Sequence, residues 1–201
     1  MMTVKDKILA LLLALAFNAF AAAWTGTTSE PSNQKKIDGK AFFVVTNANE
    51  LAWFADQVNG GKTTINAVLN NDIVFGTDTS SVCSKTWTPI GMDSSHIFNG
   101  ILDGNGFTVY GLRINGIKYA GLVGLMGREG VVRKISVAAG NYKSGGGFIG
   151  GLVGVNSGKV ETVVNKNQIS GNFAGGCVGW NAESGSVLNA WTMQEFNKRV
   201  A

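Results

Sequence analysis

The stretch Gly150-Gly151-Leu152-Val153-Gly154-Val155-Asn156 decides the fold, because it recurs twice in altered form. The upstream copy is Ala120-Gly121-Leu122-Val123-Gly124-Leu125, and the downstream copy is Gly175-Gly176-Cys177-Val178-Gly179-Trp180-Asn181. The second residues of the three copies are Gly121, Gly151 and Gly176. The intervals between these glycines, from 121 to 151 and from 151 to 176, are typical of solenoids, in which each repeat forms one coil and buries its apolar side chains against the next. The structural repeat positions are Gly121, Leu122, Gly124, Gly151, Leu152, Gly154, Gly176, Cys177 and Gly179.

Each copy is followed by a glycine and then by residues with strand spacing: Gly130-Val131-Val132, Gly158-Lys159-Val160 and Gly185-Ser186-Val187. A coil that turns sharply needs positive φ angles or close backbone approaches, and glycine allows both because it has no Cβ. Parallel coils spaced about 4.8 Å apart would satisfy each other's backbone groups. We therefore predict an all-β fold, a right-handed parallel β-helix over residues 41–190. Leu122, Leu152 and Cys177 should lie in one file.

The amino terminus has the order of a secretory signal peptide. Lys5 and Lys7 precede the apolar run Ile8 to Phe17, and small residues follow up to Ala21-Ala22-Ala23. The run is shorter than the about 20 residues that a membrane span needs. We predict a signal peptide over residues 1–23, cleaved after Ala21 or Ala23, and a secreted or cell-surface mature chain with no membrane span. Residues 24–40 are polar and predict an exposed leader without a core element.

Both ends of the predicted β-helix would expose strand edges. At the amino end, Asn47 with Glu50 three residues later predicts the start of a helix, and Leu51, Phe54 and Val58 give it one apolar face. This helix should cap the first coil. After Ala190 the repeat fades. Residues 191–201 form an amphipathic cap with Met193, Phe196 and Val200 on one face, a disordered tail, or part of a longer array.

The sequence predicts no catalytic site, no cofactor and no metal ion. A net charge of +4 without a long basic run gives no reason to expect nucleic acid. Glycoside hydrolysis needs two nearby carboxyl groups, and successive coils could bring Glu129, Glu161 and Glu183 together; otherwise these side chains face solvent. Asp103 fits a structural turn, and His96, the only histidine, lacks the partners of a catalytic triad.

Aromatic side chains are the better candidates for ligand contacts. Tyr119 and Tyr142, each beside Gly or Lys, are predicted to lie on the surface and to contact a ligand. Trp180 aligns with Val155 and Leu125, and we predict that it points into the core. Export would permit a disulfide between Cys83 and Cys177, and the sequence alone leaves open whether it forms.

The repeat resembles the GLUG motif, in which Gly-Gly-Leu-Val-Gly precedes a polar turn and a β-branched strand. Residues 150–164, 120–137 and 175–190 carry the resemblance. It implies a relation to bacterial secreted or surface proteins of the parallel β-helix kind, including adhesins of the filamentous haemagglutinin type. It also implies a non-catalytic binding, adhesion or scaffold role, with an extracellular glycan or a surface protein as partner. The alternatives are a carbohydrate-active β-helix enzyme, which would be a polysaccharide lyase or hydrolase, and a passive spacer from a longer repeat array.

Overall fold

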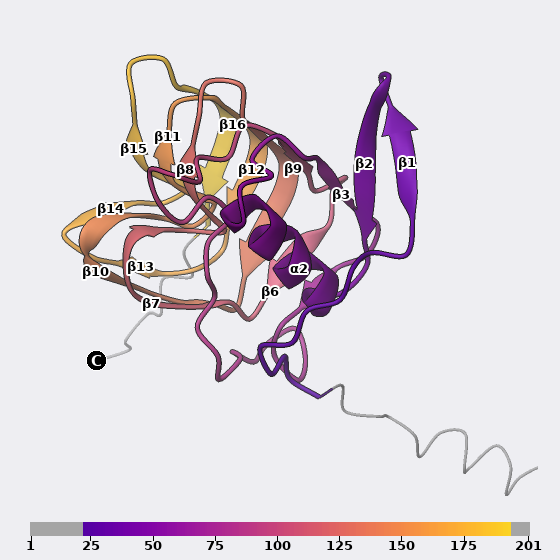
Figure 1. Cartoon of the computed structure of the whole chain (residues 1–201). Coiled ribbons are helices and arrows are strands. Elements are labelled where there is room, and N and C mark those ends of the chain that lie inside the picture. The colour runs from indigo at the N-terminus through magenta and orange to yellow at the C-terminus, as the bar shows by residue number, and fades with distance from the viewer. Residues whose placement is uncertain (1–21, 194–201) are drawn as a thin grey trace, which may run out of the picture.

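The computed structural model describes residues 22–193 (Figure 1). These residues form a parallel β-solenoid of about five turns with one helix near the amino end, as the repeat predicts. The predicted signal peptide, apart from Ala22 and Ala23, lies outside the described residues, as do Phe196 and Val200. No helix among residues 22–193 is long and apolar enough to cross a membrane.

Three sheets run along the stack, and the chain visits them in the order A, B, C in each complete coil. Sheet A contains β1 (Gln34–Ile37), β2 (Lys40–Val45), β3 (Ala67–Leu69), β4 (Ile73–Val74), β5 (Ile101–Asp103), β6 (Thr108–Tyr110), β9 (Val131–Ala138), β12 (Lys159–Asn165) and β16 (Ser186–Thr192). Sheet B contains β7 (Arg113–Ala120), β10 (Asn141–Gly150), β13 (Ile169–Ser170) and β14 (Phe173–Gly175). Sheet C contains β8 (Val123–Met126), β11 (Val153–Asn156) and β15 (Val178–Asn181). All of these pairs are parallel except β1 with β2.

The register of sheet C reproduces the spacing of the sequence repeat. Val153 pairs with Val123 on one side and with Val178 on the other, and these valines occupy the same place in the three copies of the motif. One residue earlier, the Val123 amide donates to the Leu152 carbonyl at 2.8 Å, and the Leu152 amide donates to the Cys177 carbonyl at 3.0 Å. Leu122, Leu152 and Cys177 are all buried. The predicted file is therefore confirmed.

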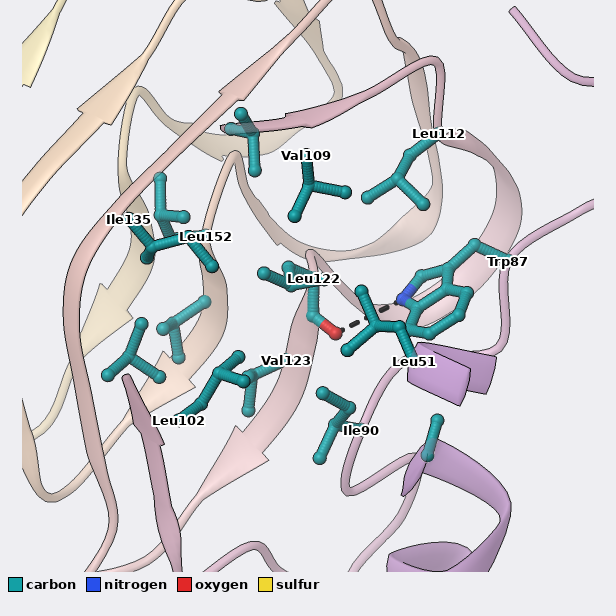
Figure 2. Close-up of a cluster of buried hydrophobic side chains, with 14 of the residues drawn as sticks. Leu51, Trp87, Ile90, Leu102, Val109, Leu112, Leu122, Val123, Ile135 and Leu152 are labelled. Carbon is teal, nitrogen blue, oxygen red and sulfur yellow. Dashed lines mark hydrogen bonds between the residues drawn. The ribbon is translucent and has the colours of Figure 1, made fainter. Parts of the chain in front are cut away.

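Interior side chains from successive coils form one continuous core. Leu102, Val132 and Val160 occupy the same register position in sheet A and are fully buried. Figure 2 shows Leu122 and Leu152 within this core, together with Trp87, whose indole Nε1 donates to the Leu122 carbonyl at 3.1 Å. Each such aliphatic side chain stabilises the fold by about 1.5–3 kcal/mol through burial.

The last glycine of each repeat copy lies where two sheets meet. A Cβ on Gly154 would lie 2.8 Å from the Ala120 nitrogen, and a Cβ on Gly179 would lie 2.7 Å from the Ile149 nitrogen. Any side chain there would collide with the end of a sheet B strand. Glycine lets these strand ends turn back closely against sheet C, which explains why the motif needs glycine at this position.

Helix α2 (Ala48–Asn59) closes the amino end of the stack, as predicted (Figure 1). Because β2 pairs directly with β3, the helix occupies the place that sheets B and C take in later coils. Its start is capped reciprocally: the Asn47 side chain accepts from the Glu50 amide at 3.1 Å, and the Glu50 carboxylate accepts from the Thr46 amide at 2.6 Å. Its apolar face is buried, and Phe54 packs edge-on against Phe98 at 6.0 Å between ring centroids.

Residues 24–40 differ from the predicted leader. Strand β1 pairs antiparallel with β2, and Trp24 packs edge-on against Phe75 with 5.1 Å between ring centroids. The sequence did not predict β1, because its polar, largely exposed residues lack an alternating apolar pattern.

The two cysteines are not bridged. Both are buried free thiols: Cys83 donates to the Lys85 carbonyl, and Cys177 donates to the Trp191 carbonyl.

Candidate binding surface

The two tyrosines predicted to contact a ligand have different surroundings. Tyr142 shares its register position with Ile114 and Ile169 and is only 2% exposed, so its prediction as a surface residue is wrong. Its hydroxyl is buried and has no hydrogen-bond partner among the described residues, and burial raises the pKa of the phenol. The physical reason is the pairing of β10 with β7, which sets this ring beside the buried Ile114, although the exposed neighbour Lys143 suggests a surface strand.

Tyr119 is half-buried on β7, and the Lys118 ammonium lies 5.1 Å from the centre of its ring. The next two coils place Phe148 and Phe173 at the same register position. We call Tyr119, Phe148 and Phe173 the aromatic column. Exposure is greatest at its end, where Phe173 is 56% exposed and its ring centroid lies 5.3 Å from that of Phe148.

Trp180 lies in register with Leu125 and Val155, as the alignment predicts, but its predicted core position is wrong. Leu125 and Val155 are half-buried and do not belong to the core, and Trp180 is 51% exposed. Its ring packs edge-on against Phe148 with 4.8 Å between centroids. Leu125 and Val155 line a surface groove, whereas the Trp180 ring packs against Phe148 and does not line this groove.

This groove, the sheet C groove, is a broad depression on the described part of the chain, with a volume of about 950 Å³. Leu125 and Val155 give it an aliphatic floor, and turns from successive coils give it a polar rim. The residues that line it are Ile97, Asn99, Leu125, Met126, Gly127, Arg128, Val155, Ser157, Ala182, Glu183 and Ser184. An apolar surface with a few convergent polar groups is the usual character of a ligand site.

The rim is held in place by a buried amide between neighbouring turns. Asn156 is fully buried; its Oδ1 accepts from the Gly158 amide at 2.9 Å, and its Nδ2 donates to the Asn181 Oδ1 at 2.7 Å. Asn181 in turn donates to the Gly185 carbonyl at 2.9 Å. The turns that carry Ser157 and Glu183 are therefore fixed relative to each other.

The three glutamates considered for hydrolysis do not converge. Glu161 lies on sheet A, where it forms an ion pair with Lys159 at 2.5 Å. Glu129 and Glu183 lie in equivalent turns of coils that are separated by one coil, so they stand roughly 9 to 10 Å apart along the stack. Both are exposed, whereas the general acid of a glycosidase needs an environment that keeps it protonated. This arrangement offers no acid–base pair with the required surroundings.

Asp103 and His96 have structural surroundings. Asp103 is buried, pairs with Arg133 Nε at 2.8 Å and accepts from the Asn105 amide at 2.9 Å, which fits the predicted turn. His96 Nδ1 lies 2.8 Å from the Asp93 carboxylate, and this hydrogen bond lowers the pKa of Asp93. Within residues 22–193, no three His, Cys, Asp or Glu side chains group closely enough to hold a metal ion.

The sequence analysis missed Phe148, Phe173 and Arg128 as surface residues. A signal for the first two was present: the steps from Tyr119 to Phe148 and from Phe148 to Phe173 nearly match those between the copies of the glycine motif. Arg128 carries no comparable signal, because its turn has different lengths in successive coils.

Comparison with known proteins gives partial matches. The chain is similar to halomucin of Haloquadratum walsbyi, with 38% identity over 94 residues that make up 45% of this chain and 1% of halomucin. It is also similar to a Gly-rich membrane protein of Evansella cellulosilytica, with 38% identity over 82 residues, or 38% of this chain and 9% of that protein. The chain thus matches a small part of either relative. No family model matches it, and no solved structure matches it.

Proposed function

We propose that this chain is a non-catalytic, secreted or cell-surface binding and scaffold module that holds an extended glycan in the sheet C groove. The observation that carries the proposal is the construction of the groove: its floor comes from the repeated positions Leu125 and Val155, its rim comes from turns of successive coils, and hydrogen-bonded strands hold these coils in register. A ligand that extends along the stack would lie on this aliphatic floor and meet a polar group of the rim at successive coils.

The chemistry of the lining favours a glycan over a strongly charged polymer. Arg128 and Glu183 supply one charge of each sign, and Ser157, Ser184 and Asn99 supply neutral hydrogen-bonding groups. Leu125 and Val155 offer an apolar surface for the C–H faces of sugar rings. Neutral donors and acceptors beside an apolar floor match a polyhydroxylated ligand.

A location outside the cell is supported by the relatives: one is halomucin and another is named a Gly-rich membrane protein, which favours the cell surface. The order of charged, apolar and small segments in residues 1–23, which is that of a signal peptide, supports export. The GLUG-type assignment remains part of this proposal, on the residues that carry the resemblance.

A glycan array probed with the labelled chain tests the binding function. Arg128→Gln and Glu183→Gln should each weaken binding to a positive glycan by about tenfold or more, because each removes a hydrogen bond to a charged group. Lys166→Gln is the matched control, since Lys166 is exposed and lies outside the groove lining. No binding to any glycan, or binding that neither groove variant weakens, would refute the proposal.

The enzyme alternative has its own test. Incubation of the chain with acidic and neutral polysaccharides should release no new reducing ends and no unsaturated products. Cleavage that Glu129→Gln or Glu183→Gln abolishes would overturn the non-catalytic assignment.

A further inference from the structure

The turn that leads from sheet C back to sheet A has different lengths in successive coils. Between the paired strand residues on either side, it comprises residues 127–130 after β8, residues 157–158 after β11 and residues 182–185 after β15. In each of the longer turns the amide of the last residue donates to the carbonyl of the first, at 3.0 Å in residues 127–130 and at 2.8 Å in residues 182–185. Two turns of the same kind therefore flank a shorter one.

The short middle turn leaves a gap between the two longer turns. A Cβ on Gly158 would collide with the carbonyls of Gly127 and Gly130, so the short turn passes close to the base of the turn before it. The middle residues of both longer turns project past the short turn and are exposed. Because the longer turns stand two coil spacings apart, roughly 9 to 10 Å, the gap is about one coil wide. We call this gap, over Ser157, the notch.

The two walls of the notch carry opposite charges. Arg128 and Glu183 are the second residues of the two longer turns, and both line the sheet C groove. Neither forms an ion pair within residues 22–193. Glu129, next to Arg128 in the chain, is not among the lining residues. One wall therefore offers the groove a guanidinium, and the other wall offers it a carboxylate.

Hydrogen bonds and packing fix the backbones of both walls. The Asn99 side chain lies against Gly127, where a Cβ would collide with it. On the other side, the Ser184 hydroxyl donates to the Ser157 carbonyl at 3.0 Å, which joins the last turn to the short turn. The separation between the two charged side chains is thus set before a ligand arrives, and a ligand spends little free energy on ordering the walls.

We propose that the notch receives a single carboxylate-bearing sugar residue, with its carboxylate toward Arg128 and its hydroxyl or amide N–H groups toward Glu183. This inference rests on the proposed function, because it concerns the glycan held in the same groove. A guanidinium binds a carboxylate through two parallel hydrogen bonds, whereas an ionised carboxylate only accepts hydrogen bonds. A second carboxylate, on the next ring toward the last coil, would approach Glu183 and be repelled. The ligand class is therefore a glycan in which an acidic residue stands among neutral ones.

An array of matched oligosaccharides tests the inference with the full mature chain. Each set, built on glucose, galactose or mannose, contains a neutral oligosaccharide, its form with one uronic acid residue, the methyl ester of that form, and a form with a uronic acid at every position. In at least one set, the single acid should bind about tenfold or more tightly than its ester, because the ester has the same shape but lacks the charge. It should also bind more tightly than the fully acidic form.

Variants of the two walls should change these preferences in different ways. Arg128→Gln should reduce the affinity for the single acid to that for its ester, and Arg128→Lys should keep part of the difference because it keeps the charge without the two parallel donors. Glu183→Gln should narrow the difference in affinity between the single acid and the fully acidic form, since it removes the repulsion. Lys166→Gln removes the same charge as Arg128→Gln but outside the groove lining, so it should leave both ratios unchanged.

The outcomes separate this inference from the proposed function. Circular dichroism should show that all variants fold, because Arg128, Glu183 and Lys166 are exposed. Equal affinity for the single acid and its ester in every set that binds, or a preference that Arg128→Gln leaves unchanged, would overturn the inference while glycan binding stands. No binding to any member of any set would overturn both.

Discussion

At the residue scale, the buried hydroxyl of Tyr142 lowers the free energy of unfolding. It has no hydrogen-bond partner among the described residues, and an unsatisfied buried polar group costs about 1–3 kcal/mol. Tyr142→Phe keeps the ring and removes this cost, so it should raise the free energy of unfolding by about 1 kcal/mol in urea denaturation. Tyr119→Phe, at a half-exposed ring, is the control and should change little. Lower stability of Tyr142→Phe would mean that the hydroxyl has a partner.

The same hydroxyl predicts a pH dependence. Burial raises the pKa of Tyr142 above the value of about 10 that it has in the unfolded chain. The unfolded state therefore loses this proton at lower pH than the folded state, so the contribution to stability is complete below about pH 10 and is lost as the pH rises further. Above about pH 10, wild-type stability should fall more steeply with pH than that of Tyr142→Phe. Parallel profiles would contradict this expectation.

At the element scale, sheet A bends at a column of left-handed residues. Lys134, Thr162 and Asn189 occupy equivalent positions in β9, β12 and β16, with φ angles of 50°, 55° and 51°. In the preceding coil, two separate strands take the place of one long strand: β5 pairs with the first half of β9, and β6 pairs with the second half. Asn adopts this conformation easily, but a β-branched residue does so with strain.

Thr162→Asn should therefore stabilise the protein. The change relieves strain at an exposed side chain, so we expect a gain of about 1 kcal/mol in the free energy of unfolding. Thr162→Val keeps the β-branch and serves as the matched control, with no gain expected. If Val and Asn give equal stability, the φ angle of residue 162 is not a source of strain.

The same sheets show which elements the sequence predicts and which it does not. The register of β8, β11 and β15 follows from the repeat, because glycine and aliphatic columns must recur wherever coils stack. The orientation of Tyr142 does not follow, since the register of β10 against β7 shifts between Lys143 and Phe148 and breaks the strict alternation. The sequence does not predict β1 for a different reason: this strand is held by backbone pairing with β2, and such pairing requires no apolar pattern in the sequence.

The sequence predicts part of the candidate site. The alignment of Trp180 with Leu125 and Val155 is correct. Alignment shows that the three side chains share a register position, but it does not show whether that position faces the core or the solvent. Burial depends on what packs over each coil, and the last coil has no described successor. Arg128 and Glu183 belong to turns of variable length, which repeat periodicity does not describe.

At the scale of the whole molecule, stability should depend on the place of a defect in the stack, because each coil contacts only its neighbours. Gly154 lies in a middle coil, and a Cβ there would meet backbone atoms of Ala120 and Gly124 at 2.8 Å. These atoms belong to strands that are packed within the stack and cannot easily move. Gly154→Ala should therefore lower the free energy of unfolding by about 2 kcal/mol or more.

Gly179 provides the comparison, since the same change there also causes a backbone collision but in the last described coil. A Cβ on Gly179 would lie 2.7 Å from the Gly154 carbonyl and the Ile149 nitrogen. Because β15 is an edge strand, the last coil can separate without disturbing the rest. Gly179→Ala should speed amide hydrogen exchange in β14, β15 and β16 and leave α2 and β3 protected, whereas Gly154→Ala should speed exchange throughout. Equal loss of protection at both ends in Gly179→Ala would show that the stack unfolds as a single unit.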